Sequence, residues 1–99
     1  MQLTANEELE LRYMQALGLK WIAKEKEGVV FAFEFKPKMM AGEDHGEWRV
    51  EDGNFEIMAL GKYNFIEWID EPMEIDKLLR DNGKNIELIE PSEQDISLL

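Results

Sequence analysis

Apolar residues recur at helical spacing near the N-terminus. Their positions fit i, i+4, i+7 and i+8: Leu9, Tyr13, Ala16 and Leu17, with Met14 beside them. Such spacing predicts one apolar face on a helix. Thr4 and Glu7 match the capping box that begins a helix. Gly18 supplies the left-handed position that ends one, and Leu19 the apolar contact after it.

Strict alternation then replaces the helical period and predicts a β-hairpin. Residues 20–25 and 29–36 read as strands, joined by a turn that ends at Gly28. Phe31, Phe33 and Phe35 share one face, which we expect to pack on the first helix. Ile22, Val30 and Ala32 lie on the opposite face. Pro37 cannot donate to a strand ladder, so it ends the second strand.

Weaker signals continue to the C-terminus. We expect a loop at 37–47, a short strand at 48–50, strands at 55–60 and 65–70, a helix from Pro72 to the stop signal at 81–83, and an edge strand at 85–90. The sum is an α+β fold: an N-terminal helix, an antiparallel sheet of three to five strands, a second short helix and an acidic C-terminal tail. Residues 1–90 would form one domain and 91–99 a mobile tail.

The opposite face of the sheet needs a cover. Ile75, Leu78 and Leu79 form an apolar stripe on the second helix, and this helix is the favoured cover. The alternative is a homodimer, or a foreign partner docked on the same face.

Charge narrows the classes of partner. The chain has 22 acidic and 11 basic residues, for a net charge of −11. Direct binding to nucleic acid is therefore disfavoured. No apolar run reaches the length of a membrane span, and the acidic, polar N-terminal segment leads us to expect no signal peptide. Cysteine is absent, which fits a reducing compartment, so we expect a cytoplasmic protein.

Motifs for catalysis are missing. His45 stands among Glu43, Asp44 and Glu47, a set that could hold a divalent metal, but adjacent loop residues more often face water. No serine has the partners of a triad, and no phosphate-binding loop is present. We therefore expect no catalytic residue, no metal, no cofactor and no enzyme.

Contact with another protein is the function class that remains. Trp48 follows a flexible loop, and Trp68 lies on the predicted strand at 65–70, so both are candidate aromatic anchors. Residues 67–99 carry ten acids against three bases. The candidate contact acids are Glu71, Glu74, Asp76 and Asp81. An acidic surface of this kind would engage a basic partner.

Three segments carry a resemblance: KWIAKEKEGVVFAFEFKPK at 20–38, GEWRV at 46–50 and FIEWIDEPMEI at 65–75. Together they resemble a group of small uncharacterised proteins of phages and prophages of Gram-positive bacteria. The turn at 25–28 departs from the Asp-x-Asp/Asn-Gly form of that group. The resemblance implies a phage or prophage protein acting in the cytoplasm of a bacterial host, and no site residue follows from it.

The sequence thus predicts a small acidic non-enzymatic accessory protein that binds a host or phage protein. One form of this hypothesis is an inhibitor that imitates DNA. The alternative is a structural, homodimeric module that uses the second face of the sheet.

Overall fold

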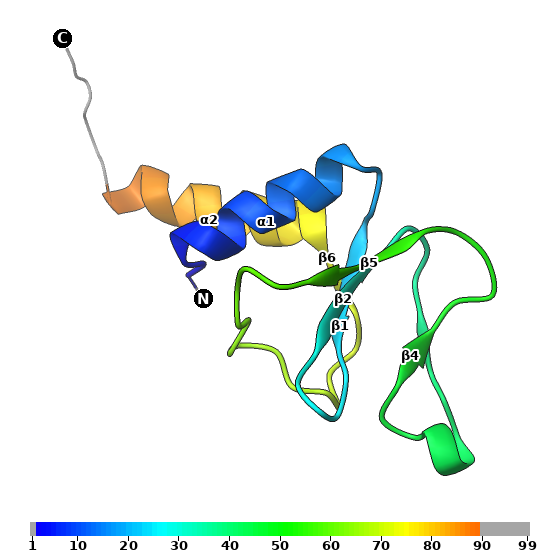
Figure 1. The fold of residues 1–99 in the computed structure, drawn as a ribbon. Coiled ribbons are helices and arrows are strands. Elements are labelled where there is room, and N and C mark those ends of the chain that lie inside the picture. Colours follow the sequence, from blue (N-terminus) through cyan, green and yellow to red (C-terminus); the bar gives the residue numbers. More distant parts are fainter. Residues whose placement is uncertain (1, 90–99) are drawn as a thin grey trace, which may run out of the picture.

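The computed structural model describes residues 2–89, and their side chains as far as residue 82. Two helices lie side by side at one end of an antiparallel sheet, and a small hairpin projects from the other side (Figure 1). The elements are α1 (Ala5–Ala16), β1 (Trp21–Lys24), β2 (Val30–Phe33), β3 (Lys38–Met39), a short 3₁₀ turn (Gly42–Asp44), β4 (Trp48–Arg49), β5 (Phe55–Met58), β6 (Met73–Glu74) and α2 (Ile75–Ile89). The predicted α+β class is confirmed. The predicted tail at 91–99 lies outside the described residues.

The main sheet has four strands in the order β5-β2-β1-β6, and every pair is antiparallel. β1 and β2 form the predicted hairpin, with Ile22 opposite Ala32 and Ala23 opposite Phe31. Its turn ends at Gly28, whose φ of 100° only glycine adopts without strain. β3 and β4 form a separate two-stranded sheet.

The predicted boundaries of α1 are confirmed. The Thr4 hydroxyl accepts from the Glu7 amide at 3.1 Å, and the Glu7 carboxylate accepts from the Thr4 amide at 3.0 Å. Gly18 has a φ of 87°, and the Leu19 amide donates back to the Met14 carbonyl. Helix start and stop are therefore set by local chemistry.

The predicted buried face of α1 was wrong. Leu9 is 61% exposed and Tyr13 59% exposed, whereas Leu11 and Met14 are buried. The buried side of the helix also carries two acids, Glu7 and Glu10. Apolar spacing pointed to Leu9 and Tyr13, but these acids have hydrogen-bond partners inside the fold, and that decides which side turns inward.

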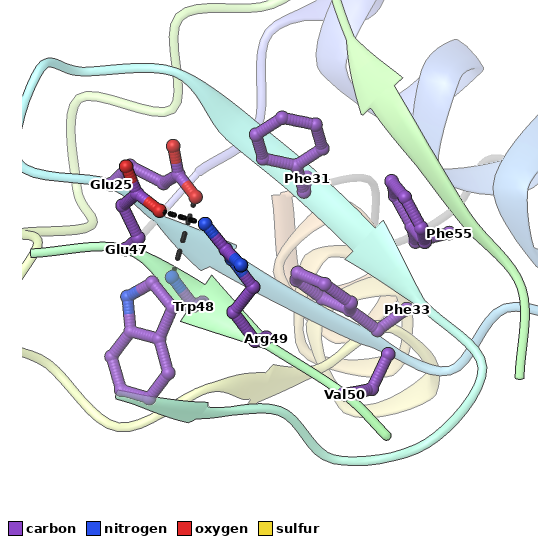
Figure 2. A pocket seen from close by; sticks show the side chains of 8 residues that line it. All are labelled: Glu25, Phe31, Phe33, Glu47, Trp48, Arg49, Val50 and Phe55. Carbon is purple, nitrogen blue, oxygen red and sulfur yellow. Dashed lines mark hydrogen bonds and ion pairs between the residues drawn. The ribbon is translucent and has the colours of Figure 1, made fainter. Parts of the chain in front are cut away.

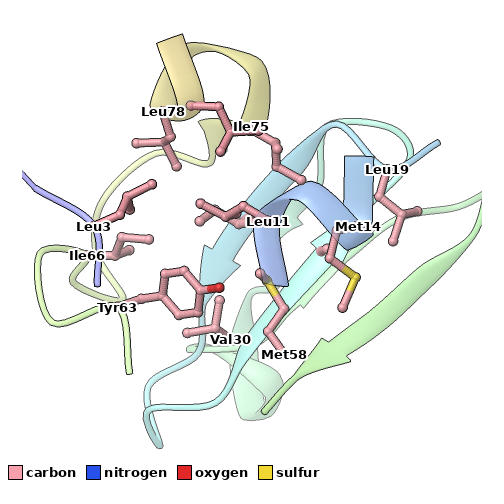
Figure 3. Close-up of a cluster of buried hydrophobic side chains, with 13 residues drawn as sticks. Leu3, Leu11, Met14, Leu19, Val30, Met58, Tyr63, Ile66, Ile75 and Leu78 are labelled. Carbon is pink, nitrogen blue, oxygen red and sulfur yellow. The ribbon is translucent and has the colours of Figure 1, made fainter. Parts of the chain in front are cut away.

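Both helices pack on the face of the main sheet that carries Ile22, Val30 and Ala32 (Figure 3). As far as side chains are described, the main core holds thirteen buried residues: Leu3, Leu11, Met14, Leu19, Ile22, Val30, Ala32, Met58, Tyr63, Ile66, Ile75, Leu78 and Leu79. The second helix covers this face, as expected from its stripe. The first helix lies there too, so its expected place on the phenylalanine face was wrong. The side chains of this face are therefore buried within the protein itself, and the homodimer considered from the sequence stays a prediction.

The phenylalanine face has a smaller cover. Phe33 and Ala23 are buried with Trp48, which comes from the β3–β4 hairpin. Phe35 lies beyond the end of β2 and is 53% exposed. The sheet is thus packed on both sides, with helices on one and the hairpin on the other.

The expected elements after β5 need three corrections. Residues 65–70 form turns instead of a strand, with the Glu67 amide donating to the Asp70 carboxylate at 2.8 Å. The second helix begins at Ile75 and not at Pro72, because the short strand β6 lies between Pro72 and the helix. α2 runs through Gly83, and residues 85–89 belong to it instead of to an edge strand. A glycine inside a helix costs only about 1 kcal/mol relative to alanine, which tertiary packing readily exceeds.

Candidate functional site: the outer edge of β5

Trp48 was predicted as a partner anchor, and it lies in the smaller core. Its exposed fraction is 7%, and its indole Nε1 donates to the Lys24 carbonyl at 2.9 Å. This bond fixes the hairpin against β1. The residue therefore offers little surface to a partner.

Trp68 lies half-buried in the turn segment at 65–70. Its ring meets the ring of His45 edge-on at 5.4 Å, and the Lys26 ammonium lies 5.7 Å from its centroid. These contacts join three loops. Among the side chains of residues 2–82, no group of three metal-ligating residues occurs, around His45 or elsewhere.

Three of the four predicted contact acids gather at one depression. Glu71, Glu74 and Asp81 line it with Asp70, and Lys77 supplies a positive charge there. Asp76 lies outside this group, and its carboxylate accepts from the Gln15 amide at 2.8 Å. Sequence spacing did not separate Asp76 from the other three acids, because the direction of each side chain depends on the residue at which α2 begins.

Two buried acids on α1 serve the fold. The Glu10 carboxylate accepts hydrogen bonds from the Ala59, Leu60 and Gly61 amides at 2.6–3.2 Å, and from the Tyr63 hydroxyl at 2.8 Å. The Glu7 carboxylate accepts from the Tyr63 amide at 2.7 Å. Burial raises the pKa of the Tyr63 hydroxyl far above its ordinary value, and the Glu10 carboxylate raises it further. These oxygens are occupied by the chain itself, so the pair positions the segment that follows β5.

β5 forms an outer edge of the main sheet. The Glu34 amide donates to the Asn54 carbonyl just before the strand begins. Hydrogen-bonded and non-hydrogen-bonded residue pairs alternate along an antiparallel ladder. The backbone groups of Glu56 and Met58 therefore also form hydrogen bonds with β2. The backbone groups of Phe55 and Ile57 therefore point away from the sheet. No other strand of residues 2–89 pairs with these donors and acceptors.

Apolar side chains surround this free edge. Phe55 is 57% exposed, Ile57 56% and Leu60 56%. Leu9 and Tyr13 of α1, also exposed, face the same region from the helix side. We call these five residues the β5 patch. Sequence reasoning missed it, because it took Leu9 and Tyr13 for core and could not place β5 at an edge.

An aromatic pocket adjoins the β5 patch on the phenylalanine face of the sheet (Figure 2). It has a volume of about 280 Å³, and Phe31, Phe33 and Phe55 lie with ring centroids 6.2 Å apart in each pair. Arg49 forms an ion pair with Glu47 at its rim. Burial raises the pKa of the nearby Glu25 carboxyl above its ordinary value, although a hydrogen bond from the Trp48 amide opposes this.

Comparisons with protein-family models, curated proteins and solved structures found no match to this chain. Among residues 2–89, no helix has the length and apolar character of a membrane span.

Proposed function

We propose that the protein is a non-enzymatic module that binds another protein by accepting an extended segment on the edge of β5. In such strand addition, main-chain hydrogen bonds supply affinity and side-chain pockets supply specificity. The observation that carries the proposal is the free edge itself, where Phe55 and Ile57 turn their backbone groups outward and keep more than half of their side chains exposed.

The other edge of the sheet gives a contrast. β6 has only two residues and follows Pro72 directly, two devices that discourage pairing with a foreign strand. β5 has four residues, and its outward-directed positions carry large apolar side chains. An edge left open in this way is expected where a partner is meant to bind.

The resemblance of the segments at 20–38, 46–50 and 65–75 to small phage and prophage proteins supports the cellular context that we propose. It favours a phage or prophage protein whose partner is a host or phage protein in the cytoplasm of a bacterium. This context stays a prediction.

The test replaces one residue at the edge. Ile57→Pro removes an outward N–H and places a ring in the path of an added strand, while the bonds to β2 come from neighbouring residues. Ile57→Thr is the matched control, because it keeps the N–H and the β-branched shape. Peptides selected from a displayed random library on the wild-type protein should bind Ile57→Thr and lose at least ten-fold in affinity for Ile57→Pro.

Circular dichroism and thermal unfolding would check that both variants fold. Amide exchange on bound wild-type protein should slow at Phe55 and Ile57. Equal affinity of the two variants, or protection confined to other residues, would overturn strand addition.

A second candidate is an acidic surface that imitates DNA and occupies a basic partner. Its support is the shared depression of Glu71, Glu74 and Asp81, together with the net charge of −11. Changing these acids and Asp76 to their amides should weaken capture of a DNA-handling enzyme from a bacterial lysate and reduce the salt dependence of that binding. Unchanged capture and salt dependence would reject it.

A further inference from the structure

A groove separates α1 from the edge of β5. It has a volume of about 440 Å³, and its lining includes Leu9 and Tyr13 from the helix and Glu56 and Leu60 from β5 and the residues after it. Glu10 also lines the groove, but its carboxylate already accepts hydrogen bonds from the Ala59, Leu60 and Gly61 amides. The groove is therefore apolar along its walls and offers one exposed acid.

That exposed acid is Glu56. It pairs with Ala32 in the ladder, so its side chain lies on the helix-facing side of the sheet. In the part of the chain that the structure describes, Glu56 has neither an ion pair nor a side-chain hydrogen bond. The groove is thus lined by one exposed carboxylate that is available to a partner.

A strand added to β5 would send alternate side chains to opposite faces of the sheet. The residue opposite Glu56 would project into the groove, and its neighbours would face Phe55 and the aromatic pocket. We infer that the groove takes an arginine or lysine side chain of the partner segment. Its stem would lie on Leu9 and Leu60, and its charged head would meet the Glu56 carboxylate and the Tyr13 ring.

This inference rests on the proposed strand addition. Charge favours a basic occupant, because opposite charges across neighbouring strands stabilise the pair and a net charge of −11 attracts cations. A second copy of the chain fits less well. Symmetric antiparallel pairing centred on Glu56 would set two carboxylates opposite each other.

The experiment compares two capped peptides, Thr-Val-Arg-Val-Thr and the same peptide with citrulline in place of arginine. Citrulline keeps the shape and removes the charge. Affinities come from amide shifts of the labelled protein on titration. The variants are Glu56→Gln and Glu51→Gln, which lose the same charge, but only Glu56 lines the groove.

We expect wild type to prefer the arginine peptide about three-fold, the order of an exposed cross-strand ion pair. Glu51→Gln should keep this preference and Glu56→Gln should lose it. No preference, undetectable binding, or equal preference in both variants would overturn the inference. If the basic side chain made no difference but Ile57→Pro still abolished binding of both peptides, the proposal of strand addition would stand and only the inference about the groove would fail. If the wild-type protein had the mass of a dimer in solution and the Ile57→Pro variant that of a monomer, the edge of β5 would serve self-association. That result would overturn both the proposed binding of a partner segment and the inference about the groove.

Discussion

At the scale of single residues, the least expected feature is the pair of buried acids on α1. Glu10 has 4% of its surface exposed, yet its two oxygens receive three amide bonds and one hydroxyl bond. Burying a charge is costly unless it is fully hydrogen-bonded, and here the chain supplies the bonds. Tyr63 adopts a φ of 51°, and its amide bonds to Glu7 in that conformation.

The substitution Glu10→Gln should therefore lower the free energy of unfolding by about 2 kcal/mol. The amide group would turn donor hydrogens toward the backbone amides of 59–61 and leave at least one of them without an acceptor. Urea unfolding measures the effect. Glu27→Gln, an exposed acid in the β1–β2 turn, is the control and should change little. A loss for Glu10→Gln below about 0.5 kcal/mol would contradict this role.

At the scale of elements, α1 carries apolar residues at helical spacing on two different faces, one buried and one exposed. Leu9 and Leu11 are two positions apart, so they point to different sides of the helix. Leu11 is fully buried beneath the helix, and Leu9 lies in the β5 patch. The exposed residues Leu9 and Tyr13 therefore add little to the main core, and the proposed strand addition gives them a binding role.

A matched pair of truncations separates these roles. Leu11→Ala should cost about 3 kcal/mol of stability, because it leaves a cavity in the main core. Leu9→Ala should cost under about 0.5 kcal/mol and weaken peptide binding at the edge of β5. Thermal and urea unfolding decide the first comparison. The reverse order of costs would show that the sequence-based face of α1 was right.

At the scale of the whole molecule, the sheet separates two cores of unequal size. Among the side chains described, at residues 2–82, thirteen buried residues lie on the helix side and three on the hairpin side. Trp48 joins the β3–β4 hairpin to the sheet through its bonds to the Lys24 carbonyl and the Glu25 carboxylate, and the Lys26 amide donates to the Gly46 carbonyl. Regions with few buried contacts open at lower free energy than the main core.

Hydrogen exchange should therefore be faster at residues 38–49 than in α1, β1 and β2. Trp48→Ala should speed exchange further in the hairpin and leave the α1 amides almost unchanged. Mass spectrometry of labelled peptides measures both. Uniform protection across hairpin and helices would mean that the two cores unfold as one unit.

Much of the local structure was predictable because its causes lie within a few residues. The capping box of Thr4 and Glu7, the turn at Gly28 and the alternation around Ile22 and Phe31 each act over short distances. The strand expected at 65–70 failed because turn hydrogen bonds there replace a ladder. The stop expected at Gly83 failed because a weak local preference yielded to the rest of the helix.

The sequence by itself determined the α+β class, the start and end of α1, the β1–β2 hairpin and the acidic charge. Each follows from propensity, periodicity or composition. Only the tertiary structure decided that the helices cover Val30 and Ala32 rather than the phenylalanines, and that β5 lies at an edge. Alternation defines two faces of a strand but does not say what covers each. Edge positions depend on pairing between residues far apart in the chain, and the candidate site depends on that pairing.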